Sequence, residues 1–366
     1  MAENVIDTLL RTMVQNRASD LHIRANGPPV MRVDGKLLAA EQILSKEETL
    51  NIAYQMMNNR QRLIFDEKHE CDMSYTLDGV GRFRCNAFLQ KGGANIAIRV
   101  VPTSIPDFDT LKLPPSVKKI AENQRGLVLV TGTTGSGKST TLASMVDHIN
   151  KTRYAHIITI EDPIEFIHRD QLSIISQREL GMDTLTYTDA LKHVVRQDPD
   201  VILLGEMRDL ETMSAALTAA QTGHLVLSTI HTIDAIQTVT RVVDMFPPYQ
   251  QNQIRLQLAD TLRGVISQRL LPHVSGQGRV PAVEVLVVTA LVKKLIGDSN
   301  SSELMTAIKQ GQFYGMQTFN QSLVKLVNEK MVTLESALEA ASNPEELMLS
   351  VRGIETGTDS GTMFGR

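Results

Sequence analysis

The sequence predicts an α/β fold in two domains, and two observations carry that prediction. Over residues 126–231, four short and almost wholly apolar stretches alternate with helical segments, which is typical of a parallel sheet buried on both faces. Over residues 1–101, an amphipathic helix is followed by short stretches of alternating polarity and turn signals, which favours a smaller α+β domain. The chain of 366 residues is long enough for both domains.

The N-terminal domain is expected to combine helices with a mainly antiparallel sheet. The segment VIDTLLRTMVQN predicts the first helix, and DLHIRA predicts a short strand. A strand pair is expected to turn at Asp34-Gly35, because this dipeptide favours hairpin turns, and a polar helical segment follows it. Three further strands are predicted at CDMSYTL, GRFRCNAFL and ANIAIRVV.

The second domain is expected to begin after a linker over residues 102–117, where four prolines cluster. The strands of its α/β core, over residues 118–288, are predicted at GLVLVTG, AHIITIED, DVILLGE and HLVLSTIH. A helix is expected at about residues 209–222, capped by Asp209 and stopped by Gly223. Short helices are predicted over residues 289–349, and a small, polar, disordered tail over residues 350–366.

Composition limits the classes of function. The formal net charge of -4 gives no broad electrostatic reason to bind nucleic acid, so no such partner is expected. No apolar run approaches the roughly 18 residues of a membrane span, and the start MAENVIDTLL lacks a signal-peptide pattern, which predicts a cytosolic protein. Cys71 and Cys85, with no CxxC, are interpreted as two buried thiols rather than a disulfide or a zinc site.

The stretch LVTGTTGSGKSTTLA, residues 129–143, matches the phosphate-binding pattern G-x-x-x-x-G-K-[ST] between an expected strand and an expected helix. Its backbone N–H groups can cradle phosphate oxygens, helped by the helix N-terminus, whereas the alternative is a structural glycine-rich turn. Lys138 is expected to neutralise β/γ-phosphate charge, and the Ser139 hydroxyl to bind Mg²⁺. The predicted nucleotide-binding residues are Gly132, Thr133, Thr134, Gly135, Ser136, Gly137, Lys138, Ser139 and Thr140.

Two carboxylates follow predicted strands, Glu161 in EDPIE and Glu206 in GEMRD. Because the carboxyl ends of parallel strands point the same way, both are expected near the phosphate-binding loop. One could orient or deprotonate an attacking water, and the other could hold the metal directly or through water. Acidic residues also follow strands as turn or cap residues, and that reading stays open for Asp162, Glu165 and Asp209.

Histidines bracket the fourth core strand. His231, at the carboxyl end of the strand, is the expected contact of the γ-phosphate, whereas His224 lies at the far end and is expected to be structural. The strand separates the two imidazoles and no cysteines accompany them, so a zinc site is disfavoured.

Arginines alternate with buried residues in the N-terminal domain. Arg82 and Arg84 lie on one face of GRFRCNAF, and Arg99 follows on the next strand. They are either solvated side chains or arginines that reach the nucleotide of another subunit, where they would stabilise transition-state charge.

Four segments resemble the Walker A, Asp box, Walker B and His box motifs of the secretion-type hexameric ATPases, specifically the type IV pilus retraction ATPases PilT and PilU. They are GTTGSGKSTTLA, ITIEDPIEF, RQDPDVILLGEMRD and TGHLVLSTIHT. The segments SDLHI, GRFRCNAF, VVDMFPPYQ, GVISQRLL and GMQTF also resemble that family, so the resemblance covers nearly the whole chain.

The resemblance implies a PAS-like N-terminal domain and a RecA-like P-loop ATPase domain, assembled as a homo-hexamer that binds ATP and Mg²⁺ between subunits. Glu161 would be the Asp-box carboxylate, Glu206 the Walker B carboxylate, which with Ser139 would hold Mg²⁺, and His231 the His-box residue. Arg84 and Arg99 would be lent to the neighbouring subunit's site.

The resemblance also implies a cellular role. ATP hydrolysis would drive pilus retraction and twitching motility from the cytoplasm, with the ring peripherally associated with the inner membrane at the pilus base. The implied partners are an inner-membrane platform protein and a paralogous retraction ATPase.

Two features bear on the kind of motor. Extension ATPases carry a further N-terminal domain and a tetracysteine zinc motif, and the absence of CxxC with a start close to SDLHI favours retraction. Many retraction ATPases show an AIRNLI-like segment, whereas residues 290–296 read ALVKKLI and lack the arginine. A PilU-like accessory or regulatory ATPase that assists a primary motor is therefore the alternative.

Two other classes of function stay open. One is a regulatory module that uses ATP as a switch and docks on another motor. The other is a nucleic-acid translocase, which the acidic balance, the lack of Trp and the 4% aromatic content disfavour.

Overall fold

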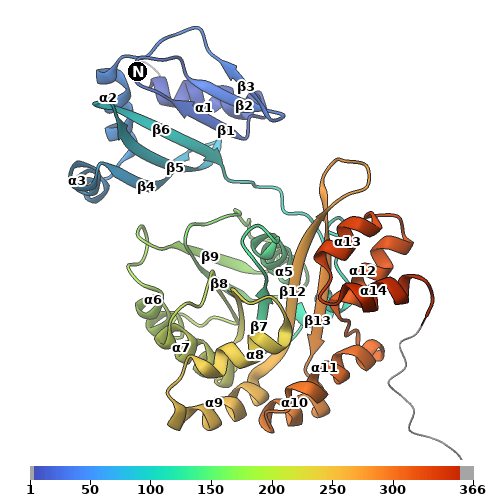
Figure 1. Ribbon diagram of the computed structural model, residues 1–366. Helices are drawn as coiled ribbons and strands as arrows, with labels where there is room; N and C mark the ends of the chain where they lie inside the picture. The colour runs from blue at the N-terminus through green and yellow to red at the C-terminus, as the bar shows by residue number, and fades with distance from the viewer. Residues whose placement is uncertain (1–3, 355–366) are drawn as a thin grey trace, which may run out of the picture. The chain divides into compact units, whose positions relative to one another are not determined.

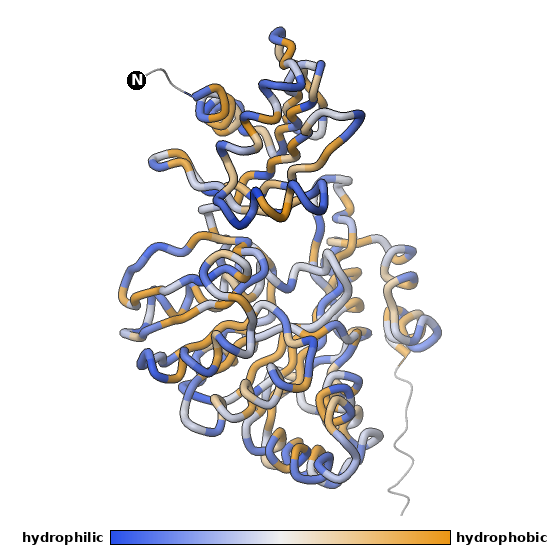
Figure 2. Tube along the Cα trace, turned by 90° about the vertical axis from the view of Figure 1, so that its left-hand side faces the viewer, coloured by the Kyte–Doolittle hydropathy of each residue, from blue (hydrophilic) through white to orange (hydrophobic). Residues whose placement is uncertain are grey.

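The computed structural model describes residues 4–354, which form two compact units (Figure 1). The first unit comprises Met1–Ser104 with the short segment Pro163–Ile167, and the second comprises Ile105–Asp162 with His168–Arg366. In both units the apolar residues follow the strands and the inward faces of the helices, as Figure 2 shows. The predicted α/β class is confirmed.

The first unit is an antiparallel sheet with helices beside it. Its sheet has the order β3-β2-β1-β6-β5-β4, and all neighbouring strands run antiparallel, as predicted. The elements are α1 Val5–Gln15, β1 Asp20–Ile23, β2 Val30–Val33, β3 Lys36–Ala39, α2 Lys46–Met56, α3 Asn59–Lys68, β4 Glu70–Leu77, β5 Gly81–Gln90 and β6 Gly93–Val100.

Local chemistry explains the details of this unit. The turn between β2 and β3 lies at Asp34 and Gly35, both of which have positive φ. The predicted polar helical segment is two helices, because Asn58 starts a second one with a reciprocal capping box to Gln61. On β5, Phe83 and Cys85 enter the core, so the intervening arginine faces outward.

The second unit is a seven-stranded sheet with helices on both faces. The sheet order is β13-β12-β7-β11-β10-β8-β9, in which only β13 pairs antiparallel. The elements are α4 Pro115–Ala121, β7 Gly126–Thr131, α5 Lys138–Thr152, β8 His156–Glu161, β9 Ile174–Glu179, α6 Tyr187–Val194, β10 Val201–Leu204, α7 Leu210–Gln221, β11 Leu225–Ile230, α8 Ala235–Asp244, α9 Pro248–Thr261, β12 Leu262–Pro272, β13 Arg279–Val287, α10 Ala290–Gly297, α11 Ser301–Gln310, η1 Gly311–Tyr314, α12 Phe319–Asn328, α13 Leu334–Ala340 and α14 Pro344–Val351.

The alternation of side chains along the parallel strands builds two cores. Leu127 and Leu129 of β7 pack with α6 through α11 on one face of the sheet. Val128 and Val130 pack with α4 and α5 on the other face. Because both faces are covered, these strands are apolar throughout, which is the pattern that the sequence shows.

The strands β7, β8, β10 and β11 lie where the sequence predicts them, whereas β9, β12 and β13 extend the sheet beyond the prediction. The strand β9 carries partly exposed polar residues, and β12 with β13 forms a long hairpin over residues for which no strand is predicted. The helix predicted at residues 209–222 is α7, with Asp209 accepting from the Thr212 backbone N–H at 2.8 Å.

The predicted linker over residues 102–117 is largely part of the second unit. Phe108 and Leu113 are buried in the core beneath α5, and α4 begins at Pro115. The prolines therefore shape a packed segment and the start of a helix rather than a free connection.

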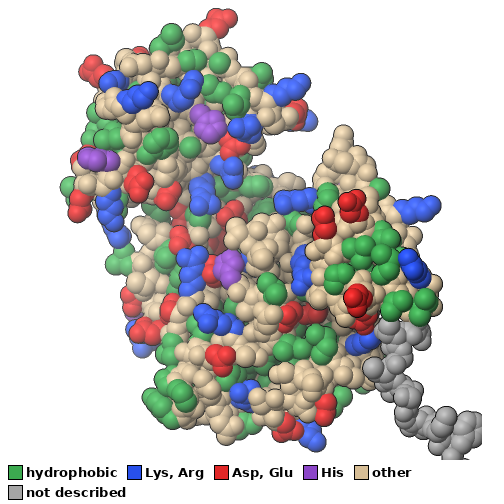
Figure 3. All heavy atoms as spheres, viewed as in Figure 1, with side chains coloured by type: hydrophobic (Ala, Val, Ile, Leu, Met, Phe, Trp, Pro, Cys, Tyr) green, Lys and Arg blue, Asp and Glu red, His purple; other side chains and the backbone are tan. Residues whose placement is uncertain are grey.

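The C-terminal helices are α10 through α14, and the last of them ends at Val351, slightly beyond the predicted range. A disordered tail is predicted over residues 350–366. Residues 355–366 of that tail lie outside the described residues. Charged side chains of both signs mingle over the face of the molecule shown in Figure 3. Within residues 4–354, every helix is too short or too polar to cross a lipid bilayer.

A buried carboxylate joins the hairpin to α8. Glu284 of β13 is only 3% exposed and accepts from the backbone N–H of Ala235, the first residue of α8, at 2.8 Å. The pKa of Glu284 is raised to about 7, chiefly by desolvation and also by the nearby charge of Asp234, although the Ala235 N–H and Arg269 oppose the shift. The protonated form is therefore favoured in the folded chain below about pH 7.

We expect the stability difference between the wild type and Glu284→Gln to depend on pH. A raised folded-state pKa contributes stability that is present below the unfolded value of 4.5 and is lost as the pH rises towards 7. The wild type should therefore lose up to roughly 3 kcal/mol relative to the glutamine variant across that range, as measured by chemical denaturation. A difference that stays constant with pH would contradict the assignment.

Candidate functional site

The candidate site lies where four parallel strands of the second unit end at one edge of the sheet. Thr131 of β7 pairs with Ile230 of β11, so the phosphate-binding loop and His231 leave the sheet side by side. In the same sheet β10 pairs with β11 and with β8, which brings Glu206 and Glu161 to the same edge. The structure thus brings together the predicted loop, both carboxylates and His231.

The loop between β7 and α5 depends on glycine for two different reasons. Gly137, at the N-cap of α5, has φ 94, a backbone conformation that disfavours other residues. At Gly132, a Cβ would lie 2.5 Å from the carbonyl oxygen of Gln268 on β12 and 2.5 Å from Ser136 Oγ. Glycine is therefore required at Gly132 because the loop packs closely against β12.

Lys138 opens α5 and reaches back over the loop. Its Nζ donates to the carbonyl oxygens of Gly132 at 2.9 Å and Thr133 at 3.0 Å. Burial lowers the pKa of the Lys138 ammonium, and the charge of Glu206 opposes that shift. The ammonium is thus held above the loop, at the N-terminus of a helix of 15 residues.

The remaining loop residues differ in exposure. Thr133, Thr134, Gly135 and Ser139 are exposed, and Thr140 is half-buried. Ser136 is buried, and its Oγ has no hydrogen-bond partner among the described residues. A polar atom of this kind, in a loop of backbone N–H groups at a helix start, fits an oxyanion ligand.

Glu206 is the most constrained of the predicted carboxylates. Its Oε1 lies 3.1 Å from His231 Nε2, and its Oε2 accepts from Arg208 Nη2 at 2.8 Å. Desolvation alone would raise the pKa of Glu206, but the hydrogen bond from Arg208 and the charge of His231 outweigh it and lower the pKa. The carboxylate is therefore kept ionised beside the imidazole.

Glu161 ends β8 and is oriented by its neighbours. Thr159 Oγ1 donates to Glu161 Oε1 at 2.7 Å, and Gln177 Nε2 of β9 donates to the same oxygen at 3.2 Å. The Tyr187 ring packs close by, since a Cβ on Gly205 would lie 2.9 Å from the Tyr187 hydroxyl. Burial, together with the charges of Asp162, Glu161 and Glu206, raises the pKa of Tyr187.

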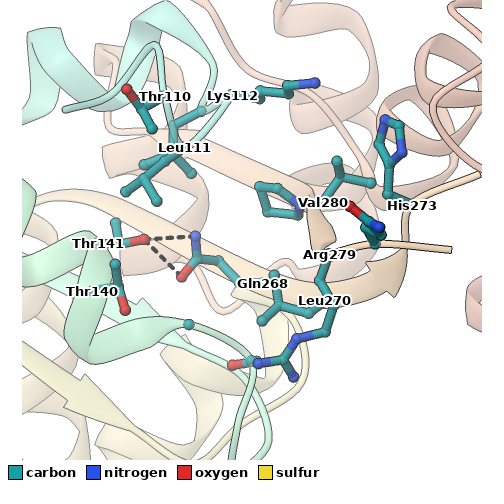
Figure 4. Close-up of a pocket in the computed structure, with 16 residues that line it drawn as sticks. Thr110, Leu111, Lys112, Thr140, Thr141, Gln268, Leu270, His273, Arg279 and Val280 are labelled. Carbon is teal, nitrogen blue, oxygen red and sulfur yellow. Dashed lines mark hydrogen bonds between the residues drawn. The ribbon is translucent and has the colours of Figure 1, made fainter. Parts of the chain in front are cut away.

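A cavity of about 330 Å³ opens beside the loop (Figure 4). Its floor includes Ser136, Gly137, Thr140 and Thr141, and Gln268 joins it from β12 through a pair of hydrogen bonds with Thr141, at 2.9 and 3.1 Å. Its other lining residues are Thr110, Leu111, Lys112, Leu113, Leu270, His273, Gln277, Gly278, Arg279, Val280 and Pro281. Apolar walls beside a phosphate-type loop suit a flat, largely apolar group such as a base.

The arginines predicted for a neighbouring site lie in the first unit. Arg84 Nη1 is 3.5 Å from Glu165, which belongs to the segment counted with that unit. Arg99 Nη2 lies 2.8 Å and its Nε 2.9 Å from Asp20. The Arg99 side chain is 71% exposed, and both arginines therefore reach the surface.

Other predicted residues have structural partners. The imidazole of His224 lies 2.9 Å from the Ala219 carbonyl oxygen at the end of α7. Asp209 caps α7, so the cap reading of that residue is correct. In the described part of the chain, no group of three or more His, Cys, Asp and Glu residues could by itself hold a metal ion.

Three contacts of the site were not anticipated: Arg208 on Glu206, Gln268 on the loop, and Tyr187 beside Gly205. Arg208 lies in the segment GEMRD and Gln268 in GVISQRLL, but neither residue lies at a motif position that would predict its contact in the site.

Comparison with known proteins gives a family match over most of the chain. The family model described as "Type II/IV secretion system protein" matches residues 1–341. The chain is 44% identical over 341 residues to the Pseudomonas aeruginosa "Type IV pilus retractation ATPase PilT", covering 93% of this chain and 99% of the relative. It is 42% identical over 355 residues to the Pseudomonas aeruginosa "Type IV pilus ATPase PilU", covering 96% and 93%.

A solved structure agrees with these relatives. The "Crystal Structure of the Pilus Retraction Motor PilT and Bound ADP" superposes with a TM-score of 0.87 and 45% identity, covering 94% of this chain and 99% of that one.

Alanine substitutions at Gly132 and Gly135 separate the effect of steric contact with β12 from the effect of backbone strain. Gly132→Ala should destabilise the chain by about 3 kcal/mol, because its Cβ meets the Gln268 carbonyl in addition to the backbone strain. Gly135→Ala is the matched control: its φ is 78 but nothing lies within 4 Å of the added Cβ, so about 1 kcal/mol is expected. Chemical denaturation measures both. Equal losses would mean that contact with β12 is not the constraint at Gly132.

Proposed function

The chain belongs to the family of type II/IV secretion system proteins and, within it, to the PilT and PilU ATPases, and we propose that its ATP hydrolysis drives the retraction of type IV pili. The observation that carries the proposal is the meeting of Lys138, Glu206 and His231 at one sheet edge, with Glu206 held ionised. A loop of this kind binds the phosphates of a nucleotide, and an ionised carboxylate beside it can assist the hydrolysis of the terminal phosphate.

The nucleotide is proposed to lie along the loop with its base in the adjoining cavity. The backbone N–H groups of residues 132–140 and the Lys138 ammonium would hold the phosphates. The apolar wall that includes Leu111, Leu270 and Val280 would receive the base. These residues extend the sequence prediction, which gave no base-binding residues.

Mg²⁺ is proposed to bind between the Ser139 hydroxyl, at the exposed start of α5, and Glu206, directly or through water. The donor set is oxygen only, as this cation prefers, and the lowered pKa of Glu206 provides the negative charge. When bound, the cation would neutralise charge on the β- and γ-phosphates.

In the proposed mechanism Glu161 and Glu206 act on the attacking water and His231 acts on the γ-phosphate. Thr159 and Gln177 orient the Glu161 carboxylate at the sheet edge, where it would orient a water. The Nε2 atom of His231 contacts the Glu206 carboxylate, so a change in the charge of either group alters the electrostatic environment of the other. Such a pair can report whether the γ-phosphate is present.

The relatives are the basis for the assembly and partners that we propose. The chain would act as a homo-hexamer in which Arg84 and Arg99 of one subunit serve the site of the next. The ring would work in the cytoplasm, peripherally bound to the inner membrane at the pilus base, with a platform protein and a paralogous ATPase as partners. No nucleic acid partner is expected.

The alternative is a PilU-like accessory ATPase that assists a primary motor. Identities of 44% to PilT and 42% to PilU favour neither role. The segment 290–296, which lacks the arginine of many retraction ATPases, forms most of α10, and Lys293 pairs with Asp260 of α9. The missing arginine in this segment is the specific observation that favours the accessory role.

We expect Glu206→Gln to lower ATP turnover about a hundredfold or more while nucleotide binding is retained, because the amide cannot accept a proton or hold a cation as the carboxylate does. Turnover is measured by phosphate release, and binding by titration with ADP. Glu211→Gln, an exposed carboxylate in the first turn of α7, is the control and should leave turnover unchanged. Turnover of Glu206→Gln within a few-fold of the wild type would remove the role assigned to Glu206.

A strain lacking the gene distinguishes the two cellular roles. Excess surface pili without twitching, restored by the wild type and not by Lys138→Ala, is the result expected of a primary retraction motor. Normal pili with motility weakened under load would indicate the accessory role. A cell without pili would mean that the motor works in the opposite direction. Pilus counts by electron microscopy and twitching zones provide the measurements.

A further inference from the structure

Arg279 stands at the start of β13, next to the phosphate-binding loop of the same unit. Its Nη1 donates to the carbonyl oxygen of Gly135 at 3.5 Å, and the residue lines the cavity together with Ser136, Gly137 and Thr140. Figure 4 shows its side chain passing Leu270 and ending beside the loop that leads into α5. Neither the motifs nor the resemblance pointed to this residue.

The backbone that carries Arg279 is fixed from two sides. Arg279 pairs with Pro272 across the hairpin, and the hairpin turn closes with a hydrogen bond from His273 N–H to the Gly278 carbonyl at 3.2 Å. The tip is also tied to the C-terminal helices, since Val274 N–H donates to the Met331 carbonyl at 2.9 Å. A side chain on a supported hairpin is presented at a defined place.

Most N–H donors of the Arg279 guanidinium form no hydrogen bond to the described residues. Among residues 4–354 the Arg279 guanidinium forms no ion pair, and its one hydrogen bond there, to the Gly135 carbonyl, is long. A guanidinium presents five N–H donors in a fork that matches phosphate oxygens, and it stays charged at all ordinary pH values. The other cation on the loop, Lys138, presents a single point charge from the opposite end, at the start of α5.

We propose that Arg279 binds the phosphate chain of the bound nucleoside di- or triphosphate, as a second cation supplied by the same subunit. The proposal rests on the proposed nucleotide site and adds a residue to it. A chain of phosphates carries several negative charges, and Lys138 neutralises one of them. Arg279 lies on the side of the loop that borders the apolar cavity, so it would act where phosphates and base meet.

The test compares the affinity of wild type, Arg279→Gln and Arg279→Lys for ATP, ADP, AMP and adenosine, by calorimetric or fluorescence titration of the full chain. A charge-assisted hydrogen bond is expected to be worth about tenfold or more in affinity, so Arg279→Gln should bind ADP and ATP at least about tenfold more weakly. Affinity for adenosine should stay the same. Arg279→Lys, which keeps the charge and loses the fork, should fall between the two.

The melting temperature without nucleotide separates contact with phosphate from support of the loop. If Arg279 contacts phosphate directly, Arg279→Gln should melt without nucleotide at the same temperature as the wild type and lose affinity only for the phosphorylated ligands. If Arg279 only braced Gly135, the glutamine variant would melt at a lower temperature without nucleotide. Equal affinity of all three proteins for ADP would also overturn the proposal. If Arg279→Gln does not fold, the lysine variant gives the same comparison.

A matched control lies outside the cavity. Arg196, which follows α6, is an exposed arginine that is not among the residues lining the cavity. Arg196→Gln should change ADP affinity less than threefold. Failure of the wild type to bind ADP at all would defeat the proposed function itself, whereas normal wild-type binding with an unaffected Arg279→Gln would defeat only the inference about Arg279.

Discussion

The register of the parallel strands β7, β11, β10 and β8 is the constraint on which the site depends. The residues that meet at the sheet edge come from four segments far apart in the sequence, and only strand pairing brings them together. Hydrogen bonds past the strand ends hold the alignment: Gly205 N–H donates to the Ile160 carbonyl at 2.8 Å, and Thr229 Oγ1 donates to the Gly205 carbonyl at 2.7 Å. A slip by one residue would turn every side chain to the other face, which the apolar layers on both faces oppose.

The strand β12 connects that edge to the C-terminal helices. The Gln268 carbonyl packs against Gly132 and its side chain bonds to Thr141 of α5. The next residue, Arg269, places its guanidinium 3.9 Å from the centre of the Phe319 ring and donates to Ser342 Oγ at 3.2 Å. Two adjacent residues of one strand thus contact the nucleotide loop on one side and α12 with the turn after α13 on the other.

The sequence predicts where the residues of the candidate site lie when their chemistry has a fixed spacing. Glycines, Lys138 and the strand-end carboxylates follow from motif and strand position, because a parallel sheet dictates where its carboxyl ends lie. Arg208, Gln268 and Tyr187 could not be predicted, since their partners lie in other elements or their residue types occur in many settings. The strand β9 was missed because IISQRE is half polar, and the hairpin of β12 and β13 because its pairing depends on tertiary contacts rather than on a turn signal.

The two arginines of the first unit differ in how freely they could leave their present partners. Arg84 and Glu165 are 3.5 Å apart with side chains 50% and 48% exposed, and ion pairs of this kind contribute at most about 1 kcal/mol. Arg99 instead directs two nitrogens at Asp20, which is 13% exposed. Burial alone would raise the pKa of Asp20, but the hydrogen bonds from Ser19 and Arg99 and the charge of Arg99 outweigh it and lower the pKa. If Arg99 moved to a phosphate, Asp20 would keep Ser19 at 2.7 Å and the more distant Arg32 at 3.9 Å. Exchange of partners is therefore easier for Arg84 than for Arg99, which also joins β6 to β1 through its pair with Asp20.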